Sequence, residues 1–383
     1  MTFTITQSLT EFGVQLQARL ARFSDSGEIT DLDETAFDQM ARSLFGLQYQ
    51  ANSAYRAWSD SRGVTPGSLR HWRQIPLVPT AAFKEVDLTC FDSSASTRCF
   101  HSSGTTTQRP SRHWHHSESL GLYRESLAAW FRYHLFAEEE PSDESSRWES
   151  DGRIAIISLT PPAEAVPHSS LAYMIATVME RFGASDSLSI GTLDSLGNWV
   201  LDTDRLLFAL RRSLCSNRPI LLVGTAFNFV HFLDLAEERN LRYRLAVGSR
   251  LMETGGYKGR SRVLDPEILH SELSRRLGIP RTHVITEYGM CELSSQAYSH
   301  RVGEASGAGN QFPPWTRIRV LSPETGAEVQ DGEIGVLGVL DLANTWSVLG
   351  VQTGDLAIRN GTRFRLVGRV PQTEPRGCSL LTA

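Results

Sequence analysis

Apolar positions in the first sixty residues recur with a helical period. Within residues 5–60, Phe12, Leu16, Leu20 and Phe23 follow one another at spacings of three and four, and no proline interrupts. A period near 3.6 places such positions on one face of a helix. The pattern predicts α-helices over residues 5–60.

Short apolar runs then alternate with amphipathic stretches. The run at 153–159 is almost continuously apolar, which is typical of a strand buried on both faces. Similar runs occupy 219–225, 244–249 and 282–286. Helical patterns separate them, at 117–136, 169–182 and 226–238. This alternation indicates an α/β fold with largely parallel sheets flanked by helices.

The pattern changes at residue 312. Short alternating segments follow, and Asp-Gly at 331–332 and Asn-Gly at 360–361 favour tight hairpins between them. We expect a small antiparallel β subdomain with strands at 315–321, 335–340, 356–359 and 364–367. The expected divisions are a helical N-terminal region packed on the core (1–90), an α/β core (91–311), the β subdomain (312–370) and a mobile tail (371–383).

Composition and charge exclude several classes of protein. The 383 residues are 40% apolar and 21% charged, which is ordinary for a globular protein, and the net charge of −5 argues against a nucleic-acid surface. No apolar run is long enough to span a membrane, and the N-terminus lacks the pattern of a signal peptide, so we expect a cytoplasmic protein. The five cysteines are scattered without a Cys-x-x-Cys pair, which argues against disulfides and structural zinc.

Candidate chemistry begins with the stretch 286–298. It reads as the end of a buried strand followed by a turn at Gly289, with Glu287 and Glu292 on either side of the turn. Open α/β sheets bind ligands beyond the carboxyl ends of their strands. Taken alone, the stretch fits an ordinary turn with solvated glutamates equally well.

A second candidate is the loop at residues 102–107, Ser-Ser-Gly-Thr-Thr-Thr. It follows a short predicted strand that ends near Phe100, and its hydroxyls and successive backbone N–H groups can form an anion-binding nest. It is not a Walker A sequence, because no Gly-Lys-Ser/Thr follows. A plain Ser/Thr-rich loop is the alternative.

Taken in order, these stretches resemble the motifs of the adenylate-forming superfamily. Residues 102–107 resemble its phosphate loop, and residues 287–292, Glu-Tyr-Gly-Met-Cys-Glu, resemble its Tyr-Gly-x-Thr-Glu motif. Thr-Gly-Asp at 353–355 and Gly-Arg at 368–369 resemble its ribose-binding motifs. Any one match is weak, but three in the right order are specific.

A narrower resemblance covers nearly the whole chain and is to the acyl-protein synthetases of bacterial luminescence (LuxE type). It implies an adenylation domain without the superfamily's large C-terminal domain. It also implies that a fatty acid is activated with ATP as acyl-adenylate, passed to a cysteine of the enzyme, and delivered to a reductase. The matching residues are 75–79, Phe83, Lys84, 254–258, Ser295, Gln296, Tyr298 and 374–379.

The resemblance implies roles for individual residues in binding ATP and Mg²⁺. Asp355 would accept the ribose hydroxyls with help from Arg369, Glu292 would hold Mg²⁺, and Tyr288 would stack on adenine beside Thr286. The ring of His168 would border the acyl pocket. The remaining nucleotide-binding positions would be Ser102, Ser103, Gly104, Thr105, Thr106, Thr107, Gly255, Gly256, Glu287 and Gly289.

Cys378 is the expected acyl carrier. It lies in Arg-Gly-Cys-Ser near the C-terminus, and Arg376 would lower its pKa and raise the thiolate fraction. The alternative is an unreactive thiol on a frayed end. Lys258 is a candidate to replace the lysine of the C-terminal domain, with a solvated surface lysine as the alternative.

Three positions depart from the superfamily pattern. Pro371 stands where an aspartate is usual after Gly-Arg, Thr107 replaces a glycine of the phosphate loop, and Cys291 replaces a threonine. These departures keep a degenerate nucleotide-binding protein open as an alternative. A second alternative is a ligase that transfers the acyl group of a fatty or aryl acid to coenzyme A or a carrier protein.

Overall fold

The computed structural model describes residues 8–27, 32–102, 109–136, 153–255 and 264–370. Within these residues, twelve strands form one sheet, in which β1 (Val78–Pro79) pairs with β15 outside the main path. The main path has the order β13-β14-β15-β16-β12-β11-β10-β9-β8-β4-β5.

One half of this sheet is parallel. Its strands are β5 (Leu188–Ser189), β4 (Ala155–Ser158), β8 (Ile220–Thr225), β9 (Arg250–Thr254) and β10 (Val284–Tyr288). The last four consist almost entirely of buried residues, as expected for strands covered on both faces. The predicted α/β class with a parallel sheet is therefore confirmed.

The prediction of a strand at 244–249 is wrong. The strand in this part of the chain is β9, which begins after the predicted segment, at Arg250. The predicted segment is irregular and ends in a turn, in which the Ser249 N–H donates to the Ala246 carbonyl at 3.0 Å and Gly248 has φ 85°. Leu245 is buried in the core, but Val247 of the same apolar run is 90% exposed. The strand predicted to start at 282 starts at 284, after the 3₁₀ turn η4 (Arg281–His283).

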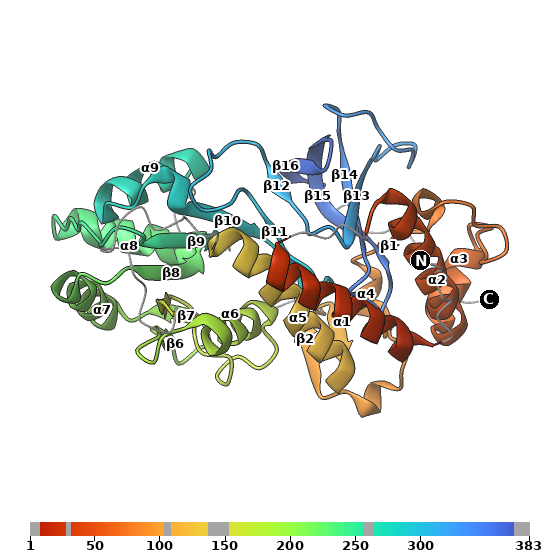
Figure 1. Cartoon of the computed structure of the whole chain (residues 1–383), viewed down its shortest axis with the longest axis horizontal. Helices are drawn as coiled ribbons and strands as arrows, with labels where there is room; N and C mark the ends of the chain where they lie inside the picture. Colours follow the sequence, from red (N-terminus) through yellow and green to blue (C-terminus); the bar gives the residue numbers. More distant parts are fainter. Residues whose placement is uncertain (1–7, 28–31, 103–108, 137–152, 256–263, 371–383) are drawn as a thin grey trace.

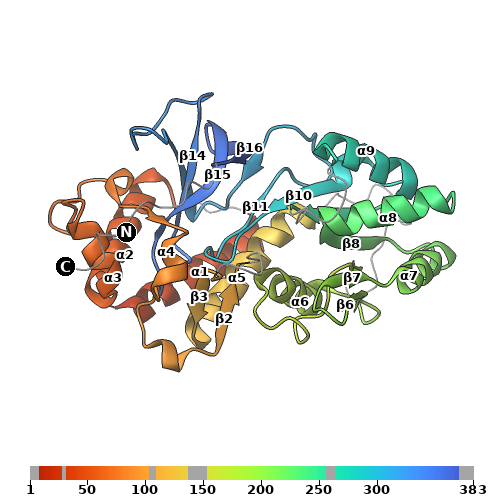
Figure 2. The same ribbon diagram turned by 180° about the vertical axis from the view of Figure 1, so that it is seen from behind.

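Helices cover both faces of the parallel half (Figures 1 and 2). Alternate strand residues point to opposite faces: Val223 packs in one core cluster with α5 (Ser117–Leu135) and α6 (Ser170–Phe182). Leu222 packs in the other cluster, with α7 (Thr203–Ser216), α8 (Ala226–Glu238) and α9 (Pro266–Leu277).

The N-terminal region is helical, as predicted. The helices are α1 (Leu9–Ser26), α2 (Glu34–Ala51) and α3 (Ser53–Asp60). Their N-caps are Ser8, Asp33 and Asn52, each of which accepts a hydrogen bond from a backbone N–H of the first turn. Gly27, in the left-handed conformation, ends α1.

The antiparallel half contains β13 (Thr316–Leu321), β14 (Ile334–Asp341), β15 (Gly350–Asn360) and β16 (Arg363–Arg369). These strands match the predicted positions, except that β15 begins at Gly350, six residues before the predicted start at 356. They continue the same sheet, because β12 (Asn310–Gln311) and β11 (Ala297–Tyr298) join β16 to β10. The division of the chain into domains stays a prediction.

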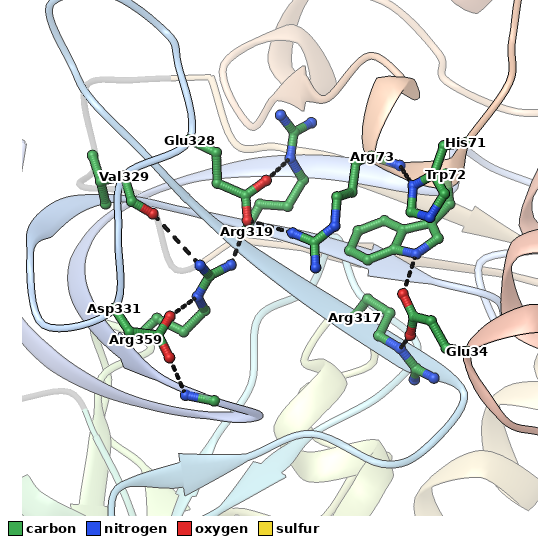
Figure 3. Close-up of polar contacts among 11 residues, drawn as sticks. Glu34, His71, Trp72, Arg73, Arg317, Arg319, Glu328, Val329, Asp331 and Arg359 are labelled. Atoms are coloured by element: carbon green, nitrogen blue, oxygen red, sulfur yellow. Dashed lines mark hydrogen bonds and ion pairs between the residues drawn. The ribbon is translucent and has the colours of Figure 1, made fainter.

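A polar network joins the N-terminal helices to the antiparallel strands (Figure 3). Glu328 accepts hydrogen bonds from Arg73 at 2.7 Å and Arg319 at 3.1 Å, and also from Arg359. Glu34 of α2 accepts from the Trp72 indole at 2.7 Å. The N-terminal region is thereby held on the sheet.

The shorter elements lie mainly in the connections. In the described ranges they are η1 (Trp72–Gln74), α4 (Ala82–Glu85), η2 (Ser93–Ala95), β2 (Arg98–His101), β3 (Arg112–His115), β6 (Gly191–Leu193) and β7 (Trp199–Leu201). No helix in these ranges is both long and apolar enough to cross a membrane.

Candidate active site

The candidate residues gather where the parallel strands end. β9 ends at Thr254 and β10 at Tyr288, and these two strands are hydrogen-bonded neighbours. The carboxyl edge of a parallel sheet is the usual ligand side of an open α/β fold. The last residues of both strands therefore lie at one edge of the sheet.

Three of the predicted residues meet at this edge. The Tyr288 hydroxyl donates to Oδ2 of Asp355 at 2.8 Å, and Nε of Arg369 donates to Oδ1 at 2.9 Å. Asp355 and Arg369 are cross-strand partners of β15 and β16, so the strand register brings them together. The side chain of Arg369 is 85% exposed, which leaves its guanidinium accessible to a ligand.

The Thr-Gly-Asp motif is held in place by hydrogen bonds of its own threonine. The backbone N–H of Asp355 donates to Oγ1 of Thr353 at 3.0 Å, and that hydroxyl donates to the Leu337 carbonyl of β14 at 2.9 Å. Asp355 is buried, but each carboxylate oxygen has further acceptor capacity. The carboxylate can thus receive two neighbouring hydroxyls while Tyr288 and Arg369 hold it.

Tyr288 is fixed from its ring as well as from its hydroxyl. The ring lies edge-on to Phe364, with centroids 5.4 Å apart, and to Phe312 at 6.0 Å. Burial, together with the charge of Asp355, raises the pKa of Tyr288 well above its usual value. The phenol therefore stays protonated and donates to the carboxylate. Its stacking on adenine stays a prediction.

Glu287 points to the opposite face of the sheet. Its cross-strand partners are Thr254 and Tyr298, and all three lie on the side covered by α5 and α6. Burial raises the pKa of Glu287 to about 7, against the effect of a hydrogen bond with Thr254. The solvated glutamate considered from the sequence is therefore wrong, and Glu287 does not join Asp355.

Gly289 has a steric role beside this carboxyl. A Cβ at this position would overlap Oε1 of Glu287, the free end of a side chain that would have to shift. The turn predicted at Gly289 lies just beyond it, where the Leu293 N–H donates to the Met290 carbonyl at 3.2 Å.

Two side chains from distant elements hold the segment that carries Glu292. The Asn344 amide donates to the Glu292 carbonyl at 3.0 Å, and Nδ1 of His113 donates to the Cys291 carbonyl at 2.8 Å. Burial lowers the pKa of His113 to about 4, so this ring is neutral at physiological pH. The backbone at Glu292, itself buried, is thereby fixed.

Cys291 is a buried, unreactive thiol. Burial raises its pKa well above the usual value, and the neighbouring Glu292 carboxylate adds to the effect through charge and a hydrogen bond. A protonated thiol is a poor nucleophile. The position is therefore structural, as predicted from its place in the motif.

A buried network follows the motif and was not predicted from the sequence. Asp341 accepts from the Ser295 hydroxyl at 2.8 Å and from the Ser294 N–H at 3.0 Å. The Trp315 indole donates to Oγ of Ser126 at 2.9 Å and to Oγ of Ser295 at 3.0 Å. These partners are far apart in the sequence, so no local sequence pattern predicts the network.

His168 and Ser102 lie together through β2 and the start of α6. Nδ1 of His168 donates to the Cys99 carbonyl at 3.0 Å, and the Ser102 backbone continues directly from β2. The Ser102 hydroxyl accepts from the Ser111 N–H at 2.9 Å, which closes the base of the loop between them. His168 is thus placed at the entrance of the predicted phosphate loop.

Several predicted residues lie outside the part of the chain that the structure describes. Gly255 is described and lies exposed just after β9. The remaining predicted positions, outside the described ranges, are Ser103, Gly104, Thr105, Thr106, Thr107, Gly256, Lys258, Pro371, Arg376 and Cys378.

The donor set suits Mg²⁺ bound together with a nucleotide. Nucleotide sites usually hold Mg²⁺ through one or two carboxylates plus phosphate oxygens and water. Glu292 supplies one such carboxylate next to the strand edge. The described residues contain no group of three or more His, Cys, Asp or Glu side chains arranged to hold a metal without a substrate.

Comparison with known sequences identifies one family. The sequence model of the family described as acyl-protein synthetase, LuxE, matches residues 144–383. The long-chain-fatty-acid–luciferin-component ligase of Aliivibrio fischeri is 23% identical over 358 residues, which are 90% of this chain and 87% of that protein.

Comparison with solved structures confirms the expected adenylation fold. An open conformation of 2-hydroxyisobutyryl-CoA ligase, in complex with 2-HIB-AMP and CoA, has a TM-score of 0.62 at 16% identity. The match covers 87% of this chain and 76% of that one. The same enzyme in its thioesterification state gives 0.64 at 16% identity, over 89% and 70% of the two chains.

Proposed function

Because the chain belongs to the LuxE family of acyl-protein synthetases, we propose that it activates a carboxylic acid with ATP and then carries the acyl group as a thioester. The observation that carries the proposal is the contact of Tyr288 and Arg369 with Asp355 at the carboxyl edge of the sheet. A carboxylate held by a phenol and an exposed guanidinium suits the ribose of a nucleotide.

The first step is formation of the acyl-adenylate. A carboxylate oxygen of the acid attacks the α-phosphorus of ATP, and the bond to the β-phosphate breaks to release pyrophosphate. Asp355 orients the ribose, Arg369 donates to the ribose or phosphate, and the loop that begins at Ser102 donates to the β- and γ-phosphates. Catalysis of this kind depends mainly on positioning and on neutralising charge.

Mg²⁺ is the expected metal, and Glu292 would hold it. When bound, the ion would supply positive charge to the phosphate oxygens. His113 and Asn344 support this role from behind, because their hydrogen bonds to the Cys291 and Glu292 carbonyls fix the backbone of the segment. Lys258 is proposed to approach the α-phosphate from the segment that follows β9.

The second step transfers the acyl group to Cys378. Its thiolate attacks the acyl carbonyl carbon, a C–S bond forms, and AMP leaves with the oxygen that joined it to the acyl group. Arg376, two residues earlier, favours the thiolate. The thioester would then be delivered to a partner such as an acyl reductase.

The acid is proposed to be a fatty acid. The basis is the name of the Aliivibrio fischeri relative, a long-chain-fatty-acid–luciferin-component ligase. An aryl acid is the other class proposed from the sequence. The two are distinguished by pyrophosphate release over a panel of aliphatic and aromatic acids at equal concentration.

Transfer to coenzyme A is a second candidate for the later step. The observation in its favour is the fold shared with 2-hydroxyisobutyryl-CoA ligase, whose structure was solved in complex with CoA. Under this alternative Cys378→Ser leaves turnover unchanged and product formation requires added coenzyme A. Under the proposed function the same variant forms one acyl-adenylate per protein molecule and then stops, because the thiol that accepts the acyl group is missing.

Pyrophosphate release tests the adenylation step. We expect Asp355→Ala and Glu292→Gln each to lower kcat/KM for ATP by about 100-fold, because ribose orientation and charge neutralisation are lost. Glu324→Gln, in an exposed turn, is the matched control and should leave the rate unchanged. Normal pyrophosphate release by both site variants would rule out the assigned site.

A further inference from the structure

Two imidazole rings lie stacked at the entrance of the predicted phosphate loop. The rings of His101 and His168 have centroids 4.1 Å apart and planes inclined by only 2°. His101 is the last residue of β2 and directly precedes Ser102, while His168 precedes Ser169, the N-cap of α6. The stack therefore joins the start of the loop to the start of a helix.

Two hydrogen bonds also hold His168 against β2. The N–H of His101 donates to the His168 carbonyl at 2.9 Å, and Nδ1 of His168 donates to the Cys99 carbonyl at 3.0 Å. A carbonyl can only accept, so Nδ1 carries the proton and Nε2 is the ring nitrogen that can exchange a proton or bind a ligand. The ring of His168 is thus fixed in plane, tautomer and direction.

We propose that His101 is a positioning residue for acid activation, whose ring holds His168 beside the phosphate loop. The inference rests on the proposed function and on the expected place of the His168 ring beside the acyl pocket. Stacked aromatic rings stabilise one another beyond the effect of the area that they bury. An aromatic side chain at position 101 should therefore preserve much of the orientation of the His168 ring, whereas the methyl group of alanine should not.

The surroundings of the stack disfavour a proton on His101. Arg112 of β3 is the cross-strand partner of His101 and forms an ion pair with Asp87 at 2.8 Å. Burial, together with the charges of His168 and Arg112, lowers the pKa of His101. His101 is therefore neutral near pH 7 and can stack on the His168 ring without bringing a positive charge to it.

Kinetics of His101→Phe and His101→Ala test the proposal. At pH 8 we expect His101→Phe to retain kcat/KM for pyrophosphate release within about threefold, and His101→Ala to lose about tenfold. His231→Ala, an exposed histidine of α8, is the matched control and should behave like the parent. Equal rates for His101→Phe and His101→Ala, whether both are retained or both lost, would overturn the proposal.

The pH profile adds a readout that a purely structural role would not change. In the parent, protonation of His101 at acid pH places a positive charge beside the His168 ring and lowers the rate. Phenylalanine cannot be protonated, so the acid limb of the His101→Phe profile should move to lower pH. An acid limb that stays in place would contradict the assigned role.

Side-chain NMR separates this inference from the proposed function. The Cε1–H resonance of His168 should carry a ring-current shift in the parent and in His101→Phe, and should lose it in His101→Ala. If the parent releases no pyrophosphate with any acid, the proposed adenylation is wrong. The NMR measurement still tests whether His101 orients the ring of His168. A His168 resonance unchanged in His101→Ala would overturn the positioning of this ring.

Discussion

At the scale of single residues, the site depends on what holds Asp355. The carboxylate accepts a phenol hydroxyl on one oxygen and a guanidinium on the other, and a threonine hydroxyl fixes the backbone beneath it. Thr353 is the partner that lies close to Asp355 in the sequence, within the Thr-Gly-Asp motif. Tyr288 and Arg369 come from other strands. The orientation of the carboxylate is therefore a product of strand register.

Tyr288→Phe tests this orientation without changing the size of the side chain. We expect the KM for ATP to rise about tenfold, because Asp355 loses the phenol that holds Oδ2, while the melting temperature stays close to that of the parent. Tyr243→Phe is a matched control, since its hydroxyl has no hydrogen-bond partner in the described structure. A KM that is unchanged in Tyr288→Phe would mean that Asp355 is not oriented by this bond.

Motif residues and their supports differ in how far the sequence predicts them. Tyr288, Asp355 and Arg369 were predicted from short motifs, and the structure brings them together. The supports His113 and Asn344 were not, because one lies on β3 and the other beyond β14, and their contacts to the segment at 291–292 exist only after folding. His101 was missed for the same reason.

At the scale of elements, periodicity predicted the helices of residues 5–60 and the antiparallel strands after 312 well. The failure at 244–249 has a physical cause. Its apolar residue Leu245 is buried through an irregular segment that hydrogen-bonds the end of α9, where the Leu245 N–H donates to the Leu277 carbonyl at 3.0 Å. Val247 of the same run is 90% exposed, so an apolar run shows neither that every residue is buried nor that the segment is a strand.

The network of Figure 3 is one of the polar ties between the N-terminal region and the antiparallel strands. Burial raises the pKa of Glu328, but hydrogen bonds and charges from Arg359, Arg73 and Arg319 outweigh it and leave the pKa below the usual value for a glutamate. The ionised carboxylate is therefore more stable in the folded chain than in the unfolded one.

Glu328→Gln should lower the free energy of unfolding at pH 7 by about 1–2 kcal/mol, because three arginines lose their shared carboxylate. The parent's advantage is present above the unfolded pKa and is lost as pH falls through the lower folded pKa, so the difference between parent and variant should shrink as pH falls below the ordinary glutamate pKa of about 4.3. Urea unfolding at pH 7 and at pH 3.5 measures both values, with Glu324→Gln as the exposed control. A difference that is independent of pH would exclude an electrostatic tie.

At the scale of the whole molecule, one continuous sheet carries the nucleotide-binding candidates. Tyr288 lies at the end of its parallel half, while Asp355 and Arg369 lie in its antiparallel half, and β11 and β12 join the two. The sheet therefore sets the distance between the adenine side and the ribose side of the proposed site. The likeness to 2-hydroxyisobutyryl-CoA ligase over 87% of this chain places this arrangement in a known fold.

The central claim is that the chain acylates itself at Cys378, and intact mass tests it most directly. The protein is incubated with ATP, Mg²⁺ and a fatty acid, and its mass is measured with and without hydroxylamine. We predict an acyl-sized increase that maps to Cys378, is removed by hydroxylamine, disappears in Cys378→Ser and persists in Cys215→Ser, which changes an exposed cysteine of α7. Release of pyrophosphate without any adduct, or an adduct that survives in Cys378→Ser, would contradict the account.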